Sequence, residues 1–159
     1  MRKTFAALTL AVGLTGCATP QPPLLKNTAS GRAEGVFVNT SLESAKSQII
    51  SKCATRGANV LDTSGNQVVC GNEMKGGQAI GYQILLGNSY STTPQVKVRF
   101  VFATEGKDVR VIAFPWVETI MPLGQPRTMD LNGNADRNDI QKMLNEATVT
   151  ADGYWRPNW

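Results

Sequence analysis

The clearest pattern along the chain is an alternation of apolar and polar residues in its second half. After Pro94, large apolar side chains recur at every second position, and a polar turn at Thr104–Asp108 precedes a second alternating run, Val109–Ile120. A period of two is typical of a strand with one buried face, so the pattern predicts two long antiparallel strands. Pro115 lacks a backbone donor and predicts an edge strand or a bulge. The apolar positions of the first strand are Val96, Val98, Phe100 and Phe102.

Two other segments carry the apolar spacing of helices. Ser41–Arg56 has an apolar stripe, a capping box formed by Thr40 and Glu43, and Gly57 as a stop signal. A capping box satisfies the free backbone N–H groups of a first helical turn, and glycine readily adopts the left-handed conformation that ends many helices. Asp136–Ala147 carries a similar stripe. Both ranges are therefore predicted to be helices.

The remaining segments are shorter. Glu34–Asn39 is a strand candidate, and Ala58–Asp62 with Gln67–Cys70 flanks a Gly-Asn turn typical of a hairpin. Ala79–Leu86 alternates in a glycine-rich region, which favours a strand over a helix. Met121–Gly133 is predicted to be a loop, because it contains glycines, prolines and polar residues without a sustained period.

The predicted order of elements is β-α-β-β-β-β-β-α. A meander of antiparallel strands with two helices on one face makes an α+β two-layer sandwich. The length of 159 residues allows one such domain, predicted at residues 34–150.

The first residues carry an export pattern. Arg2 and Lys3 precede Thr4–Gly16, thirteen residues without a charge. This run is too short to span a bilayer but has the length of a secretory signal. It ends in Leu14-Thr15-Gly16-Cys17, which resembles the lipobox of bacterial lipoproteins.

The resemblance to lipoproteins implies cleavage of residues 1–16 and attachment of diacylglycerol and a fatty acid such as palmitate at Cys17. Ala18 follows, and not the aspartate of an inner-membrane retention signal, so the resemblance implies an outer-membrane anchor with the domain facing the periplasm. An ordinary secretory signal is the alternative. The order of elements also resembles the helix-grip domains of some outer-membrane assembly lipoproteins, a likeness of fold alone.

Composition and charge exclude several classes of function. The chain is 42% hydrophobic and 18% charged, which is typical of a globular domain. It has no histidine, which excludes Ser-His and Cys-His nucleophilic pairs and histidine metal sites. Cleavage before Cys17 leaves 14 basic and 12 acidic residues. Because these form no dense basic run, we expect no nucleic-acid partner.

The cysteines predict one disulfide. If Cys17 carries lipid, Cys53 and Cys70 remain, and an even remainder in an oxidising compartment favours a bridge. In the chain-entropy description such a bridge contributes about 3 kcal/mol. Two reduced, buried cysteines are the alternative.

The two ends of the exported chain differ in character. Residues 17–33 are rich in proline and small polar residues and are predicted to be a flexible tether after the lipidated cysteine. Residues 151–159 form a tail with aromatic side chains at Tyr154, Trp155 and Trp159. These rings are candidates for partner binding, because tryptophan, tyrosine and arginine dominate binding hot spots. The alternatives are packing of the tail onto the domain and insertion at a membrane interface.

An Asn/Asp-rich stretch resembles an EF-hand calcium loop. Asp130, Asn132 and Asn134 stand at its first, third and fifth positions. However, Ala135 occupies the glycine position, and Gln141 replaces the carboxylate that closes the ligand shell. We therefore interpret the stretch as a turn that caps a helix. No metal and no other cofactor is expected.

The expected function is non-catalytic. The carboxylates are scattered, and the chain has no Ser-x-x-Lys motif, so we expect no enzyme. The hypothesis is a lipid-anchored envelope protein that presents a small α+β domain to a protein partner, as an assembly or secretion accessory. An alternative is a phage- or plasmid-type exclusion lipoprotein that blocks a receptor or an injection machinery.

Overall fold

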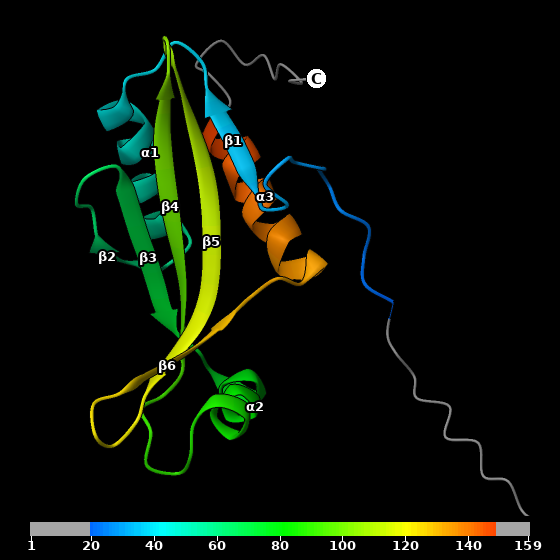
Figure 1. Cartoon of the computed structure of the whole chain (residues 1–159), viewed down its shortest axis with the longest axis vertical. Coiled ribbons are helices and arrows are strands. Elements are labelled where there is room, and N and C mark those ends of the chain that lie inside the picture. The colour runs from blue at the N-terminus through cyan, green and yellow to red at the C-terminus, as the bar shows by residue number, and fades with distance from the viewer. Residues whose placement is uncertain (1–19, 149–159) are drawn as a thin grey trace, which may run out of the picture.

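The computed structural model describes residues 20–148. This part of the chain forms a six-stranded antiparallel sheet and three helices (Figure 1). The strand order is β1-β5-β4-β3-β2, and β6 pairs with β5 beyond the end of β1. The elements are β1 (Glu34–Phe37), α1 (Leu42–Thr55), β2 (Asn59–Asp62), β3 (Gln67–Glu73), α2 (Gly76–Leu86), β4 (Gln95–Glu105), β5 (Asp108–Ile120), β6 (Pro126–Asp130) and α3 (Asn134–Thr148).

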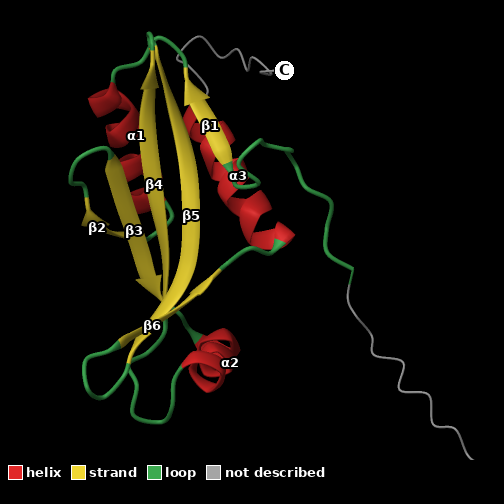
Figure 2. Cartoon of the chain, viewed as in Figure 1, coloured by secondary structure: helices red, strands yellow, loops and turns green. Residues whose placement is uncertain are grey.

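Two helices cover one face of the sheet. Helix α1 packs on β2, β3 and β4, α3 packs on β1, and the two helices touch each other. Figure 2 shows both behind the sheet, whereas α2 stands apart at one end of the molecule. The core between the layers contains Phe100 and Phe102 from β4, Ile49 from α1 and Leu144 from α3, each at most 1% exposed. The predicted α+β sandwich is confirmed.

The two predicted long strands form the centre of the sheet. Strands β4 and β5 pair in register from Gln95↔Glu118 to Glu105↔Asp108, and the residues Gly106-Lys107 connect them. Gly106 has φ +65°, which suits the first central position of a type II′ turn. The helix-facing positions of β5 are buried at every second residue, because the alternation in the sequence matches the pleat of the sheet.

Helix α1 forms as predicted but has a different cap. Its N-cap is Ser41, whose side chain accepts a hydrogen bond from the Ser44 amide. The predicted cap, Thr40, instead donates its hydroxyl to the carbonyl of Val38. At the other end Gly57 has φ +73° and donates to the Ala54 carbonyl, as a glycine stop requires.

The segment predicted as a strand at Ala79–Leu86 is helical and forms α2. A short apolar run cannot be assigned from its period alone. In the folded protein β3 pairs directly with β4 along seven residues, from Gln67↔Val101 to Glu73↔Gln95, so the connection between them does not lie between these strands in the sheet. A helix satisfies the backbone groups of this segment internally.

The predicted loop Met121–Gly133 contains one more strand, β6. It pairs with the last residues of β5, from Trp116↔Asp130 to Ile120↔Pro126. Strand β1 reaches only to Ile112 along the same edge of β5, so β6 continues the sheet where β1 ends. The β6 pairing depends on the part of the β5 edge that β1 leaves unpaired, and the local sequence of residues 126–130 does not show this.

Pro115 lies in an interior strand, contrary to the edge or bulge predicted for it. The Ala113 amide donates a hydrogen bond to the carbonyl of Ala33, the residue before β1. The Pro115 carbonyl accepts one from the amide of Leu131, the residue after β6. The backbone N–H and C=O groups of the odd-numbered residues of β5 therefore point toward the edge that pairs with β1 and β6. Pro115 lies on this edge between the end of β1 pairing and the start of β6 pairing. A missing donor at this junction removes no hydrogen bond from the β4–β5 ladder.

The stretch predicted as a flexible tether is held against the domain from Gln21 onward. The Leu25 amide donates to Asn138 Oδ1 at 2.8 Å, and the Asn138 side chain donates to the Pro23 carbonyl at 2.8 Å. Arg137 donates to the carbonyl of Lys26 at 2.9 Å. Residues 21–28 therefore lie along the first turns of α3.

Removing the Asn138 amide tests this docking. Asn138→Ala is expected to increase hydrogen exchange of the Leu25 amide at least tenfold and to lower the free energy of unfolding by about 1 kcal/mol, the usual size of one hydrogen bond. Lys142→Ala is the matched control, because Lys142 is exposed on the same helix. Equal exchange of Leu25 in both variants would show that the segment is not held by Asn138.

Candidate functional site

The sheet face opposite α1 and α3 is uncovered within residues 20–148 (Figure 1). Cross-strand pairing brings Arg99 beside Phe114 and Lys97 beside Trp116. Glu118 lies two residues further along β5 and points to the same side. With Arg32, which precedes β1, these side chains form what we call the open-face cluster: Arg32, Lys97, Arg99, Phe114, Trp116 and Glu118.

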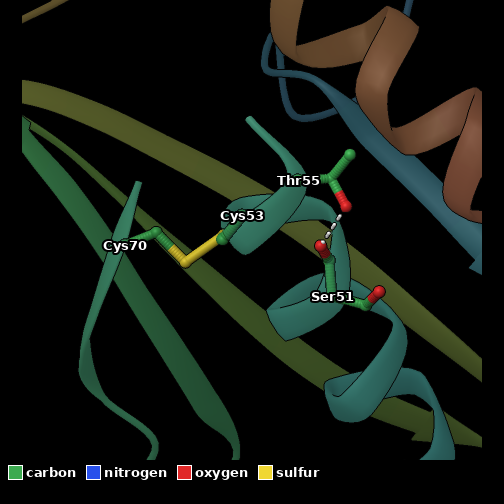
Figure 3. Close-up of a disulfide and its surroundings, with 4 residues drawn as sticks. All are labelled: Ser51, Cys53, Thr55 and Cys70. Atoms are coloured by element: carbon green, nitrogen blue, oxygen red, sulfur yellow. Dashed lines mark hydrogen bonds between the residues drawn. A yellow bond between two sulfur atoms is a disulfide. The ribbon is translucent and has the colours of Figure 1, made fainter. Parts of the chain in front are cut away.

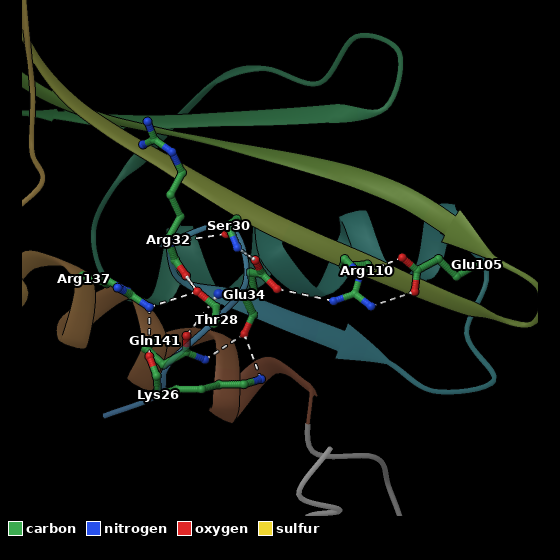
Figure 4. Close-up of polar contacts among 9 residues, drawn as sticks. All are labelled: Lys26, Thr28, Ser30, Arg32, Glu34, Glu105, Arg110, Arg137 and Gln141. Atoms are coloured by element: carbon green, nitrogen blue, oxygen red, sulfur yellow. Dashed lines mark hydrogen bonds and ion pairs between the residues drawn. The ribbon is translucent and has the colours of Figure 1, made fainter. Parts of the chain in front are cut away.

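Phe114 is the centre of the open-face cluster. The guanidinium carbon of Arg32 lies 4.5 Å from the centroid of its ring, and that of Arg99 lies 5.4 Å away. Both distances allow cation–π attraction, worth about 0.5–1 kcal/mol at an exposed site. Figure 4 shows the Arg32 side chain pointing away from the contacts that Arg137 and Gln141 make.

The two arginines differ in their remaining contacts. Arg32 also forms an ion pair with Asp130 at 3.8 Å. Arg99 is exposed and has no acidic partner among the described residues. Its guanidinium therefore keeps its planar donors available for an incoming carboxylate.

Trp116 is held by a polar contact at the edge of its ring. Its indole nitrogen donates to Glu118 at 3.2 Å, and Glu118 also pairs with Lys97. Burial by itself raises the pKa of Glu118, but the hydrogen bonds from Lys97 and Trp116 outweigh it and lower that pKa. Glu118 thus stays ionised at neutral pH and fixes the orientation of the indole.

A network of polar contacts, separate from the open-face cluster, joins the N-terminal segment to the sheet (Figure 4). Arg110 lies between Glu34, at 3.3 Å, and Glu105, at 2.6 Å. The hydrogen bond from Arg110 lowers the pKa of Glu105, and the same bond raises the pKa of Arg110. Gln141 of α3, 1% exposed, bonds both backbone groups of Glu34. These contacts are structural: they hold β1 between α3 and β5.

Two hollows share Arg32 and Pro115 among their lining residues. One opens on the uncovered face beside the open-face cluster and is lined by Arg32, Arg99, Phe114, Pro115, Trp116, Thr128 and Asp130. The other lies on the α3 side, with Ile140 and Arg137 among its lining residues. The first exposes an aromatic ring together with cations, which are the groups that bind protein surfaces strongly.

The predicted disulfide is confirmed. Cys53 of α1 and Cys70 of β3 are bonded, with their Cα atoms 6.3 Å apart, and each is 3% exposed (Figure 3). The bridge links helix to sheet inside the core. It stands apart from the open-face cluster, on the other face of the sheet.

The residues of the calcium-like stretch have other roles. Asp130 ends β6 and pairs with Arg32, and the Asn134 side chain donates to the carbonyl of Pro22. Gln141, at the position of the missing carboxylate, bonds Glu34. Within residues 20–148, no three histidine, cysteine, aspartate or glutamate side chains gather as metal ligands would.

The other predicted site residues lie outside the described part of the chain. These are the lipidation candidate Cys17 and the aromatic residues Tyr154, Trp155 and Trp159. None of the helices within residues 20–148 is long and apolar enough to cross a membrane.

Sequence reasoning missed the open-face cluster, although it left a signal. The outward positions of β5 include Ile112, Phe114 and Trp116, where a solvated strand face ordinarily carries polar residues. Apolar residues on both faces of a strand indicate that both faces make contacts. Arg99 could not be placed beside the ring without the pairing of β4 with β5, nor Arg32 without the pairing of β1 with β5. No protein-family model, no curated protein and no solved structure matches this chain, so its function is inferred from this surface.

Proposed function

We propose that this protein is a non-catalytic, lipid-anchored envelope protein that binds a protein partner through the open-face cluster. The observation that carries the proposal is the exposed Arg99 beside the Phe114 ring, on a sheet face that no described element covers. An aromatic ring flanked by arginines has the composition of a binding hot spot. The open-face cluster lies mainly on paired strands of the sheet, which hold its side chains in place. We therefore expect little reorganisation on binding.

The anchor in this proposal is Cys17, at the end of the lipobox-like Leu14–Cys17. Several acyl chains at one residue bind a bilayer firmly, because each buried CH₂ contributes about 0.8 kcal/mol. Ala18 at the next position supports outer-membrane attachment with the domain in the periplasm, because the aspartate of an inner-membrane retention signal is replaced there.

The chemistry of the cluster indicates what the partner presents. Arg99 offers paired N–H donors without a local carboxylate, and Phe114 with Trp116 offers apolar area next to it. The partner surface that fits carries an aspartate or glutamate beside an apolar side chain. Glu118 has a lowered pKa and stays ionised, which suits electrostatic recognition and not proton donation.

Site-specific photo-cross-linking in cells tests the proposal. A photoreactive residue in place of Ala103, an exposed position on β4, is expected to give an adduct of defined mass. Arg99→Glu should reduce that adduct and weaken binding of the purified partner at least tenfold, because it removes one charge-assisted contact and adds repulsion.

The control is Lys107→Glu, which makes the same change of charge at the exposed β4–β5 turn. An adduct that persists unchanged in Arg99→Glu would place the partner elsewhere. The identity of the adduct separates the two roles considered: an envelope assembly or secretion component supports the accessory role, and a receptor or injection protein supports exclusion.

A further inference from the structure

Helix α2 leaves most of its apolar side chains in solvent. Ile80 is 63% exposed, Ile84 is 78% exposed and Leu85 is 66% exposed, whereas Ala79 is the helix's buried residue. Ile80 and Ile84 are four residues apart and share one helix face. A contiguous apolar face of this kind on a surface helix indicates a contact that the isolated domain does not make.

The end of the molecule around α2 carries no charged side chain and exposes several large apolar ones. Residues 76–94 contain no charged side chain, and neither do residues 119–126, which include the β5–β6 connection. Tyr90 is 84% exposed and Leu123 is 87% exposed in these two segments. Helix α2 contacts β5 and β6, which places both segments at the end of the sheet opposite the β4–β5 turn (Figure 1).

Cations border this apolar end. Lys75 precedes α2 and Arg127 follows the β5–β6 loop; both are exposed and neither has an ion pair among the described residues. Apolar side chains with a tyrosine, bordered by lysine and arginine, match the interface of a bilayer with anionic lipids.

The position of Cys17 selects the bilayer as the occupant. Gln21 is fixed by accepting a hydrogen bond from the Asn134 amide at 3.3 Å. The four residues from Cys17 to Gln21 reach at most about 14 Å when extended. Strand β6, from Asp130 back to Pro126, spans about 14 Å toward α2, whereas β5 spans about 27 Å from Trp116 to the opposite turn at Asp108.

The α2 end therefore lies much closer to the reach of an anchor at Cys17 than the opposite end does. Figure 1 agrees: the described N-terminal segment begins in the half of the molecule that holds α2 and β6. We infer that the apolar α2 end, with Ile80, Ile84 and Leu85, rests in the headgroup region of the phospholipid bilayer. This inference depends on the proposed lipid anchor.

The contact gives the domain a defined orientation. The anchor holds α2 at a high effective concentration near the lipid, so a weak apolar contact suffices. The β4–β5 turn then points away from the membrane, and the open-face cluster stands at the side of the domain. A partner can reach the cluster without displacing the anchor.

A fluorophore on α2 tests the orientation. Full-chain acylated protein carrying Ile84→Cys is labelled with an environment-sensitive dye and reconstituted in vesicles of phosphatidylethanolamine and phosphatidylglycerol. The disulfide occupies Cys53 and Cys70, and acylation occupies Cys17, so the new thiol is the reactive one. We expect blue-shifted emission and at least twofold quenching by spin-labelled lipid. The control, Lys107→Cys, should show neither.

The outcomes are distinguishable. Intact mass establishes acylation before reconstitution, and a protein without acyl chains contradicts the proposed anchor. An acylated protein whose Ile84 probe is no more quenched by lipid than the Lys107 probe overturns the orientation alone. Blue-shifted emission without lipid quenching also overturns it, since another protein surface, such as a second copy, then covers α2.

Discussion

Replacing Cys53 and Cys70 together by alanine is expected to lower the free energy of unfolding by about 3 kcal/mol, because the bridge closes a loop with a sequence separation of 17. The expected fall in Tm is about 10 °C. Both sulfur atoms lie in the core, where Cys53 and Cys70 belong to one cluster with Ile49 and Val68. The bridge therefore ties α1 to β3 at the point where the two layers meet.

Urea unfolding of the oxidised wild type and the double variant measures this difference. The slope of the transition should be smaller for the wild type, since a cross-linked unfolded chain exposes less surface. Wild-type protein in reductant is the control and should approach the stability of the double variant. An oxidised wild type that unfolds at the same free energy as the double variant would show that the bridge contributes nothing.

Cys17→Ser is expected to release the protein from the membrane fraction or to leave it as an uncleaved precursor. A serine hydroxyl does not replace the thiolate as acceptor of the diacylglycerol group, so every acyl chain is lost. Metabolic labelling with a fatty-acid analogue, followed by fractionation, measures the effect. The loss should be complete, because Cys17 is the one acylation site proposed.

Ala18→Ser is the matched control, a polar change one residue beyond the proposed cleavage site. It should retain both the label and the membrane association. A Cys17→Ser protein that still incorporates the fatty-acid label would disprove the anchor. A variant that is processed to mature size and stays in the membrane fraction without label would point to another means of attachment.

Together the proposed contacts divide the domain into surfaces with separate tasks. One face of the sheet packs on α1 and α3 and contains the disulfide, and the opposite face carries Arg99 and Phe114. We propose that the α2 end faces the bilayer, and residues 21–28 lie along α3 between the proposed anchor and the rest of the domain. Substitutions on the open face should therefore change partner binding while they leave the membrane contact unchanged.

Local pattern was sufficient for the elements whose stability is decided by their own residues. The alternation in Val96–Phe102 specifies β4 because a pleated strand places every second side chain on the core face. The stripe of Ser41–Arg56 and the stop at Gly57 specify α1 for the same kind of local reason. The Cys53–Cys70 bridge was predicted from the parity of the cysteines that remain when Cys17 is assigned to lipid.

Tertiary structure decided what depends on a partner strand or surface. Ala79–Leu86 is helical in a connection that cannot lie between β3 and β4, because these two strands pair directly, and β6 forms because β5 extends beyond β1. Pro115 is tolerated inside the sheet only because two strands meet beside it. The cluster of Arg32, Arg99 and Phe114 exists because strand pairing joins positions distant along the chain. Hydrogen-bond partners in a sheet are non-local, so no local period encodes them.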